Sequence, residues 1–219
     1  MMHSNPFSTK FVQPGAIDYV LPEGTTWDKL LKLFIRNQLR GQVVGPHGVG
    51  KSTFLCSFLL HLSTDTGIKV TRINLQANRR DWSLVRTELA KLPAAGQMRH
   101  VLVIDGFEQL NMYQRWYTRW RTHRAGSGLL VTVHQAERKL PLLFHASHDW
   151  QRFQSLVAKL LSEHSANRPL LDKQTIASVY QQHATAGNLR EVLFELYDQA
   201  EQNLCSSRTF TTTITPRKD

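Results

Sequence analysis

The sequence predicts a three-layer α/β/α protein, in which helices cover both faces of a parallel β-sheet, with a short helical lid at its C-terminal end. Between residues 41 and 148, apolar runs typical of buried strands alternate with longer stretches of helical spacing. From residue 149 onward the pattern is helical only. We therefore expect an N-terminal lead-in and flanking helix over 1–40, the sheet core over 41–148, the helical lid over 149–203 and a mobile tail over 204–219.

Strands of the core are predicted from apolar runs, and helices from apolar residues three and four positions apart. The run Val101–Ile104 is unbroken, as in strands buried on both faces of a parallel sheet. The flanking helix is expected over about 26–38, before the core. In chain order the core is then expected to contain a strand over 42–45, a helix to about 63, a strand over 68–75, a helix over 82–92, a strand over 101–105, a helix over about 109–124, and strands over 129–134 and 141–145. Apolar residues over 150–161, 176–180 and 189–200 mark three helices of the lid.

Composition limits the class of protein. The chain has 219 residues, 41% of them apolar and 20% charged, which is enough for one good core. Its two cysteines make no disulfide framework, and no apolar run approaches the ~20 residues of a membrane span. The N-terminal residues lack the pattern of a secretory signal. We therefore expect a cytoplasmic protein without membrane insertion.

The most specific motif is the stretch from Gly45 to Thr53, which fits the phosphate-binding template G-x-x-x-x-G-K-[ST] (a P-loop) between an expected strand and an expected helix. Its glycines let backbone N–H groups and the helix N-terminus point at a phosphate chain. Lys51 would reach the β- and γ-phosphates, and the Ser52 hydroxyl would ligate Mg²⁺. We expect nucleotide contacts along the whole loop, from Gly45, Pro46, His47, Gly48, Val49, Gly50, Lys51, Ser52 and Thr53.

A carboxylate provides the second element of this site. Asp105 ends the apolar run that begins at Val101, about 50 residues after the P-loop, and so resembles a Walker B aspartate that holds Mg²⁺ through water. A helix-capping aspartate is the alternative.

These motifs resemble those of the additional-strand P-loop ATPases, the AAA+ class, over residues of about 40–200. A third stretch, Gly187-Asn188-Leu189-Arg190-Glu191, is similar to a motif in the lid of AAA+ proteins, where the arginine reaches back to the phosphates as a second sensor. The resemblance implies that role for Arg190, with a solvent-facing arginine as the alternative.

The resemblance also implies roles for Glu108 and His134. In the related ATPases the residue after the Walker B aspartate is commonly a glutamate that orients the attacking water, but here it is Gly106, and Glu108 follows three positions after Asp105. Glu108 is either the displaced base or a helix-start acid. Among the polar residues at the end of the fourth strand, Thr132, His134 and Gln135, the expected γ-phosphate sensor is His134, and a capping or surface role is its alternative.

The helix that follows Asp105 carries both arginines and tryptophans, and they permit three interpretations. One arginine could act as a trans-acting finger in an oligomer, or the two residue types together could bind single-stranded nucleic acid. We expect the third, in which Met112, Trp116 and Trp120 form a core stripe and the arginines face water. The arginines are Arg115, Arg119, Arg121 and Arg124, and the basic surface extends to Arg72, Arg79 and Arg80.

The predicted function is ATP binding with Mg²⁺-dependent hydrolysis of the β–γ phosphate bond. The alternatives are a small-molecule kinase and a non-enzymatic, nucleotide-gated module. The net charge of +10 permits attraction to nucleic acid, to an anionic membrane surface or to an acidic protein, and homo-oligomers are compatible with the sequence. No N-K-x-D guanine selector follows the fourth strand, which favours ATP over GTP.

Overall fold

The computed structural model describes residues 5–76, 81–92, 100–147, 149–164, 171–184 and 188–209. The chain divides into two compact units. The sheet unit is Leu21–Ser147, and the helical unit combines Met1–Val20 with His148–Asp219.

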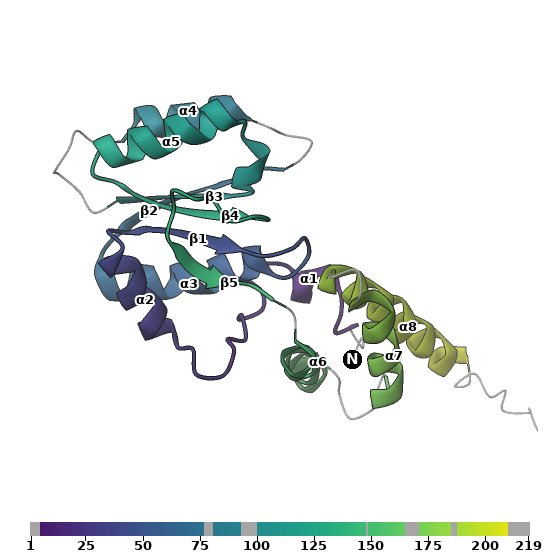
Figure 1. Cartoon of the computed structure of the whole chain (residues 1–219). Coiled ribbons are helices and arrows are strands. Elements are labelled where there is room, and N and C mark those ends of the chain that lie inside the picture. Colours follow the sequence, from purple (N-terminus) through teal and green to yellow (C-terminus); the bar gives the residue numbers. More distant parts are fainter. Residues whose placement is uncertain are drawn as a thin grey trace, which may run out of the picture. The chain divides into compact units, whose positions relative to one another are not determined.

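A five-stranded, fully parallel sheet forms the centre of the sheet unit, with strand order β2-β3-β4-β1-β5 (Figure 1). The strands are β1 (Arg40–Val44), β2 (Lys69–Asn74), β3 (His100–Asp105), β4 (Gly128–Val133) and β5 (Leu142–His145). Every residue of β3 and β4 is buried, as the unbroken apolar runs predict. Strand β4 lies between β1 and β3, so the P-loop strand and the strand that ends at Asp105 are separated by one additional strand.

Helices cover both faces of this sheet. Figure 1 shows α2 (Trp27–Arg36) and α3 (Lys51–Thr66) on one face, and α4 (Trp82–Ala90) and α5 (Met112–Arg124) on the other. The α2/α3 side has an aromatic core, in which the buried rings of Phe54 and Phe144 stack with centroids 4.4 Å apart. The α4/α5 side has a mostly aliphatic core around Val85, Leu89 and Ile104.

Helix α5 buries the face opposite to the one predicted, so the expected core stripe is wrong. Met112, Trp116 and Trp120 are exposed, whereas Thr118 and Thr122 are fully buried. The threonines fit there because each hydroxyl donates a hydrogen bond to a backbone carbonyl of α5, over 2.8 and 2.9 Å respectively. Their small side chains let the helix approach the sheet.

The helical unit has its own core. It contains α1 (Thr9–Val12), α6 (Trp150–His164), α7 (Lys173–Ala184) and α8 (Leu189–Thr209). Phe7 and Ile17 of the N-terminal segment share this core with residues of α6, α7 and α8, and the Asn5 amide donates to the Tyr197 carbonyl over 2.9 Å. Helix α8 continues past the expected boundary at 203, and the remainder of the expected tail, 210–219, lies outside the described residues.

In the part of the chain that the structure describes, no helix combines the length and the apolar character needed to cross a lipid bilayer.

Candidate functional site

The P-loop connects the end of β1 to the start of α3. Gly48 and Gly50 have φ angles of 73° and 91°, a region that residues with a side chain rarely adopt, and Gly50 caps α3. Gly45 is needed for a different reason, since a Cβ atom there would lie 2.4 Å from the Ala146 carbonyl oxygen. Val49 is buried and anchors the loop, whereas Pro46 and His47 are exposed.

Lys51 lies in the first turn of α3 with its side chain folded back onto the loop. Its ammonium group donates to the carbonyl oxygens of Gly45 and Pro46, each over 2.7 Å. Burial lowers the pKa of Lys51, while the negative charges of Glu108 and Asp105 act in the opposite direction. Ser52 and Thr53 follow in the same turn and are half-buried. The first turn of α3 therefore faces the same region as the two carboxylates.

Asp105 is buried at the end of β3 and held by two neighbouring strands. The Thr132 hydroxyl of β4 donates to Asp105 Oδ1 over 2.8 Å and accepts the Gly106 N–H over 2.7 Å. From β2, Arg72 forms an ion pair with Asp105 Oδ2 at 3.0 Å and also donates to the Cys56 thiol over 2.8 Å. A carboxylate accepts about four hydrogen bonds, so Asp105 keeps acceptor capacity beyond these two partners.

Glu108 and His134 meet beside this aspartate. Glu108 Oε1 lies 3.3 Å from His134 Nε2, and the His47 and His134 ring centroids are 5.1 Å apart. Burial lowers the pKa of His134 below its usual 6.5, Glu108 opposes this, and Lys51 and His47 lower the pKa further. The lowered pKa favours the neutral form of the His134 ring. The other oxygen, Glu108 Oε2, is buried and has no hydrogen-bond partner among the described residues.

Backbone geometry explains why glycine follows Asp105. Gly106 has a φ of 85°, and a Cβ atom at this position would lie 2.5 Å from the Leu75 carbonyl oxygen. A glutamate directly after Asp105 is therefore disfavoured. The chain instead enters a 3₁₀ turn, Phe107–Gln109, which places Glu108 against His134.

Arg190 lies in the other unit, exposed in the first turn of α8, with its guanidinium carbon 5.4 Å from the centroid of the Phe194 ring. Asn188 precedes the helix and donates to Glu191 over 2.8 Å, whereas Gly187 lies outside the described residues. The sensor role of Arg190 stays a prediction of the resemblance.

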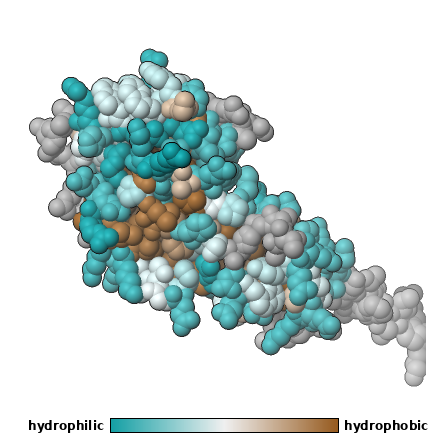
Figure 2. Space-filling view, in the orientation of Figure 1, coloured by the Kyte–Doolittle hydropathy of each residue, from teal (hydrophilic) through white to brown (hydrophobic). Residues whose placement is uncertain are grey.

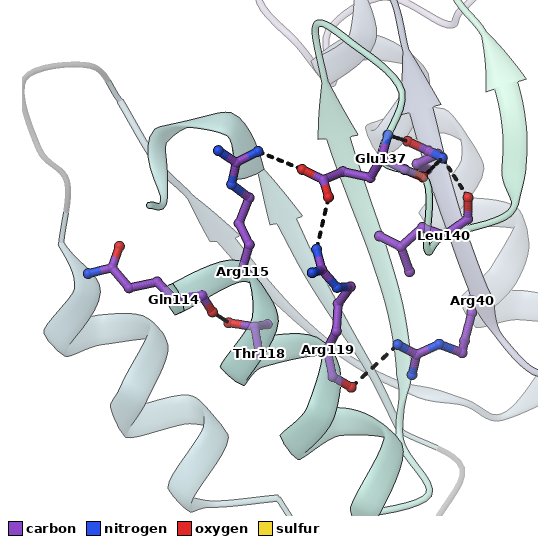
Figure 3. Close-up of polar contacts among 8 residues, drawn as sticks. Arg40, Gln114, Arg115, Thr118, Arg119, Glu137 and Leu140 are labelled. Atoms are coloured by element: carbon purple, nitrogen blue, oxygen red, sulfur yellow. Dashed lines mark hydrogen bonds and ion pairs between the residues drawn. The ribbon is translucent and has the colours of Figure 1, made fainter. Parts of the chain in front are cut away.

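A network that the sequence does not reveal fixes the segment after β4 (Figure 3). The buried Gln42 side chain of β1 donates to the carbonyls of Glu137 and Leu140, over 2.9 and 2.6 Å, and accepts the Glu137 N–H over 2.7 Å. The Glu137 carboxylate in turn binds Arg115 and Arg119 of α5, at 2.6 and 2.8 Å. The expectation that the α5 arginines face water is thus wrong for these two, and the side chain of Arg119 is only 15% exposed.

Among the described residues, no three histidine, cysteine or acidic side chains gather closely enough to hold a metal ion by themselves. A Mg²⁺ ion at this site would rest on Asp105, Ser52, water and the phosphates of its nucleotide, the arrangement usual for P-loop proteins. Arg79 and Arg80, expected to extend the basic surface, lie outside the described residues.

The sequence matches no protein-family model and no curated protein. Solved structures do match. Domain III of the replication initiation protein DnaA from Thermotoga maritima is 16% identical with a TM-score of 0.54, and the alignment covers 90% of each chain. AMPPCP-bound DnaA from Aquifex aeolicus is 13% identical with a TM-score of 0.55, over 90% of this chain and 65% of that one. The chain has the AAA+ fold. The predicted fold class and the resemblance to additional-strand P-loop NTPases are therefore confirmed, and β4 is the additional strand.

Proposed function

We propose that this chain binds ATP with Mg²⁺ through the P-loop and hydrolyses the β–γ phosphate bond. The observation that carries the proposal is the convergence of Lys51, Asp105, Glu108 and His134, which come from the first turn of α3 and from the segments at the ends of β3 and β4. Ligands of parallel α/β sheets bind at this edge. The likeness to an AMPPCP-bound protein of the same fold supports a nucleotide as the ligand.

The residues fit a nucleotide with its metal ion. Lys51 now donates to the neutral carbonyl oxygens of Gly45 and Pro46. Because a charged phosphate oxygen is a stronger acceptor, the Lys51 side chain would turn toward the β- and γ-phosphates of a bound nucleotide. Ser52 and Asp105 would hold Mg²⁺, which neutralises charge on the phosphates.

Glu108 is suited to orient the attacking water. Its unsatisfied Oε2 atom is buried and would gain a partner from a water molecule there. The lowered pKa favours the neutral ring of His134, whose Nε2 lies 3.3 Å from Glu108 Oε1. A proton on Nε2 could face Glu108, and a turn of the ring would let it donate to the γ-phosphate. As the water oxygen bonds to the γ-phosphorus and the bond to the ADP oxygen breaks, one proton of that water would pass to Glu108 and the other would stay on the new phosphate.

The nucleotide-gated module is the second candidate, and one observation favours it. Both carboxylates already have partners, because Asp105 is paired with Arg72 and Glu108 contacts His134. If these contacts persist after ATP binds, turnover is slow until a partner releases them. The small-molecule kinase stays a hypothesis of the sequence.

The test is steady-state ATP turnover with Mg²⁺ for wild type, Lys51→Ala and Glu108→Gln. The proposal predicts that Lys51→Ala abolishes turnover, and that Glu108→Gln keeps ATP binding but loses at least about 10²-fold in rate. Glu88→Gln, a glutamate of α4 paired with Lys91, is the matched control and is expected to leave the rate unchanged. Full turnover by Glu108→Gln would make Glu108 a helix-start acid. Tight binding by wild type with no turnover would favour the gated module.

A further inference from the structure

The outward face of α5 carries three large aromatic side chains that are well exposed to solvent. Tyr113, Trp116 and Trp120 are 66%, 47% and 43% exposed. Their spacing of three and four residues places them on one face of the helix. The Tyr113 and Trp116 centroids are 5.9 Å apart, and the Trp116 and Trp120 centroids 6.1 Å, with the two indoles within 11° of parallel. We call these three residues the aromatic ladder.

Cationic groups surround the aromatic ladder. The helix Met112–Arg124 contains four arginines and one histidine and no acidic residue. The guanidinium carbon of Arg124 lies 5.8 Å from the Trp120 ring centroid, at the end of the ladder. A shallow hollow beside the two indoles is lined by Arg40, Trp116, Arg119, Trp120, His123 and Lys139. Glu137 neutralises one of the two arginines it binds, so the surface keeps a positive surplus.

This surface differs from an aliphatic docking patch. In Figure 2 the surface over α5, at the top of the view, is pale and teal, whereas the brown apolar patch lies below it, over the region of β5 and α2. Tryptophan and tyrosine have intermediate hydropathy and flat π-faces. The chemistry offered by α5 is therefore stacking together with positive charge.

We propose that the α5 face binds single-stranded nucleic acid, with bases stacked on the aromatic ladder and phosphates held by Arg124, His123 and Lys139. Unpaired bases have free π-faces that stack on indoles regardless of sequence, and a polyanion matches the acid-free helix. A duplex keeps its bases stacked inside. A second copy of this chain fits less well, because a two-fold contact would place the same arginine-rich helix against itself in a chain of charge +10.

The test measures fluorescence anisotropy of a labelled oligothymidylate titrated with the full chain, without ATP. The double variant Trp116→Ala/Trp120→Ala should weaken binding by about 10-fold or more for each indole removed. The double Phe variant, which keeps an aromatic ring at both positions, should retain most of the affinity. Leu60→Ala removes an exposed apolar residue from α3 and should change nothing.

The charge contribution has its own measurement. A plot of the logarithm of the binding constant against the logarithm of salt concentration should fall less steeply for Lys139→Ala, by about one unit of slope. Lys32→Ala, at an exposed lysine on α2, should leave the slope nearly unchanged. Lys51→Ala should bind the oligonucleotide like wild type, so this proposal and the ATPase proposal fail separately.

Three results would overturn the inference. One is equal affinity for wild type and the double Ala variant. Another is tighter binding to a duplex of the same length. The third is that wild type is a dimer and the double Ala variant a monomer, while both bind the oligonucleotide equally well. That result would make the α5 face a contact between copies of the chain.

Discussion

Gly106 shows how one backbone position can change the layout of the candidate site. With a φ of 85° and the Leu75 carbonyl oxygen 2.5 Å from the position of a Cβ, it disfavours a glutamate directly after Asp105, where the resemblance to AAA+ ATPases would place one. The nearest acid is then Glu108, which the following 3₁₀ turn directs toward His134. The altered motif thus has a physical cause in the path of the chain beside β2.

We predict that Gly106→Ala lowers the free energy of unfolding by about 2–4 kcal/mol, because it combines left-handed strain with a backbone clash. Gly24→Ala is the matched control, since Gly24 has a φ of 77° but nothing within 4 Å of its Cβ position, and it should cost only about 1 kcal/mol. Urea denaturation of the two variants checks this. Equal losses would show that the Leu75 carbonyl gives way.

At the scale of elements, the hydrogen bonds and ion pairs around Glu137, which we call the Glu137 clamp, help to decide which face of α5 packs on the sheet. Gln42 holds the segment after β4 to β1, and the Glu137 carboxylate then holds two arginines of α5 (Figure 3). With Arg115 and Arg119 tied inward and two threonines against the sheet, the indoles of Trp116 and Trp120 are left on the outside.

We predict that Gln42→Ala destabilises the sheet unit by about 2–4 kcal/mol, because it leaves the Glu137 N–H and two carbonyls without partners in a buried place. Gln42→Leu should also destabilise it, although it keeps the volume. Gln135→Ala, an exposed glutamine in the same segment, should change stability by less than about 0.5 kcal/mol. Thermal unfolding measures all three, and a stable Gln42→Leu variant would show that the clamp adds nothing.

The same elements show which features a sequence can and cannot predict. The P-loop and the buried strands were predictable because their signals are local: a glycine template, and apolar runs such as Val101–Ile104. The buried face of α5 was not predictable, because period alone does not say which face of a helix is buried. The exposed aromatic residues and the buried threonines of this helix both recur every four residues. Ion pairs such as that of Arg72 with Asp105 join residues that are far apart in the sequence, and the order of the strands in the sheet determines which of them meet.

At the scale of the whole molecule, the chain has the AAA+ fold and divides into a sheet unit and a helical unit with its own hydrophobic core. The N-terminal segment joins the helical unit, where Asp18 pairs with Lys159 of α6 at 3.2 Å. The candidate catalytic residues therefore belong to the sheet unit, and Arg190 belongs to the helical unit, which has a hydrophobic core of its own. We propose that the P-loop of the sheet unit alone binds a nucleoside triphosphate.

Calorimetric titration of the full chain with ATP and Mg²⁺ measures this binding, with Lys51→Ala and Lys32→Ala titrated beside wild type. We predict saturable binding by wild type and by Lys32→Ala, and binding at least about 10-fold weaker for Lys51→Ala, because a charge-assisted hydrogen bond contributes about 1.5–3 kcal/mol. If folded wild type showed no saturable binding, or Lys51→Ala bound ATP as tightly as wild type, the P-loop would not be a nucleotide site.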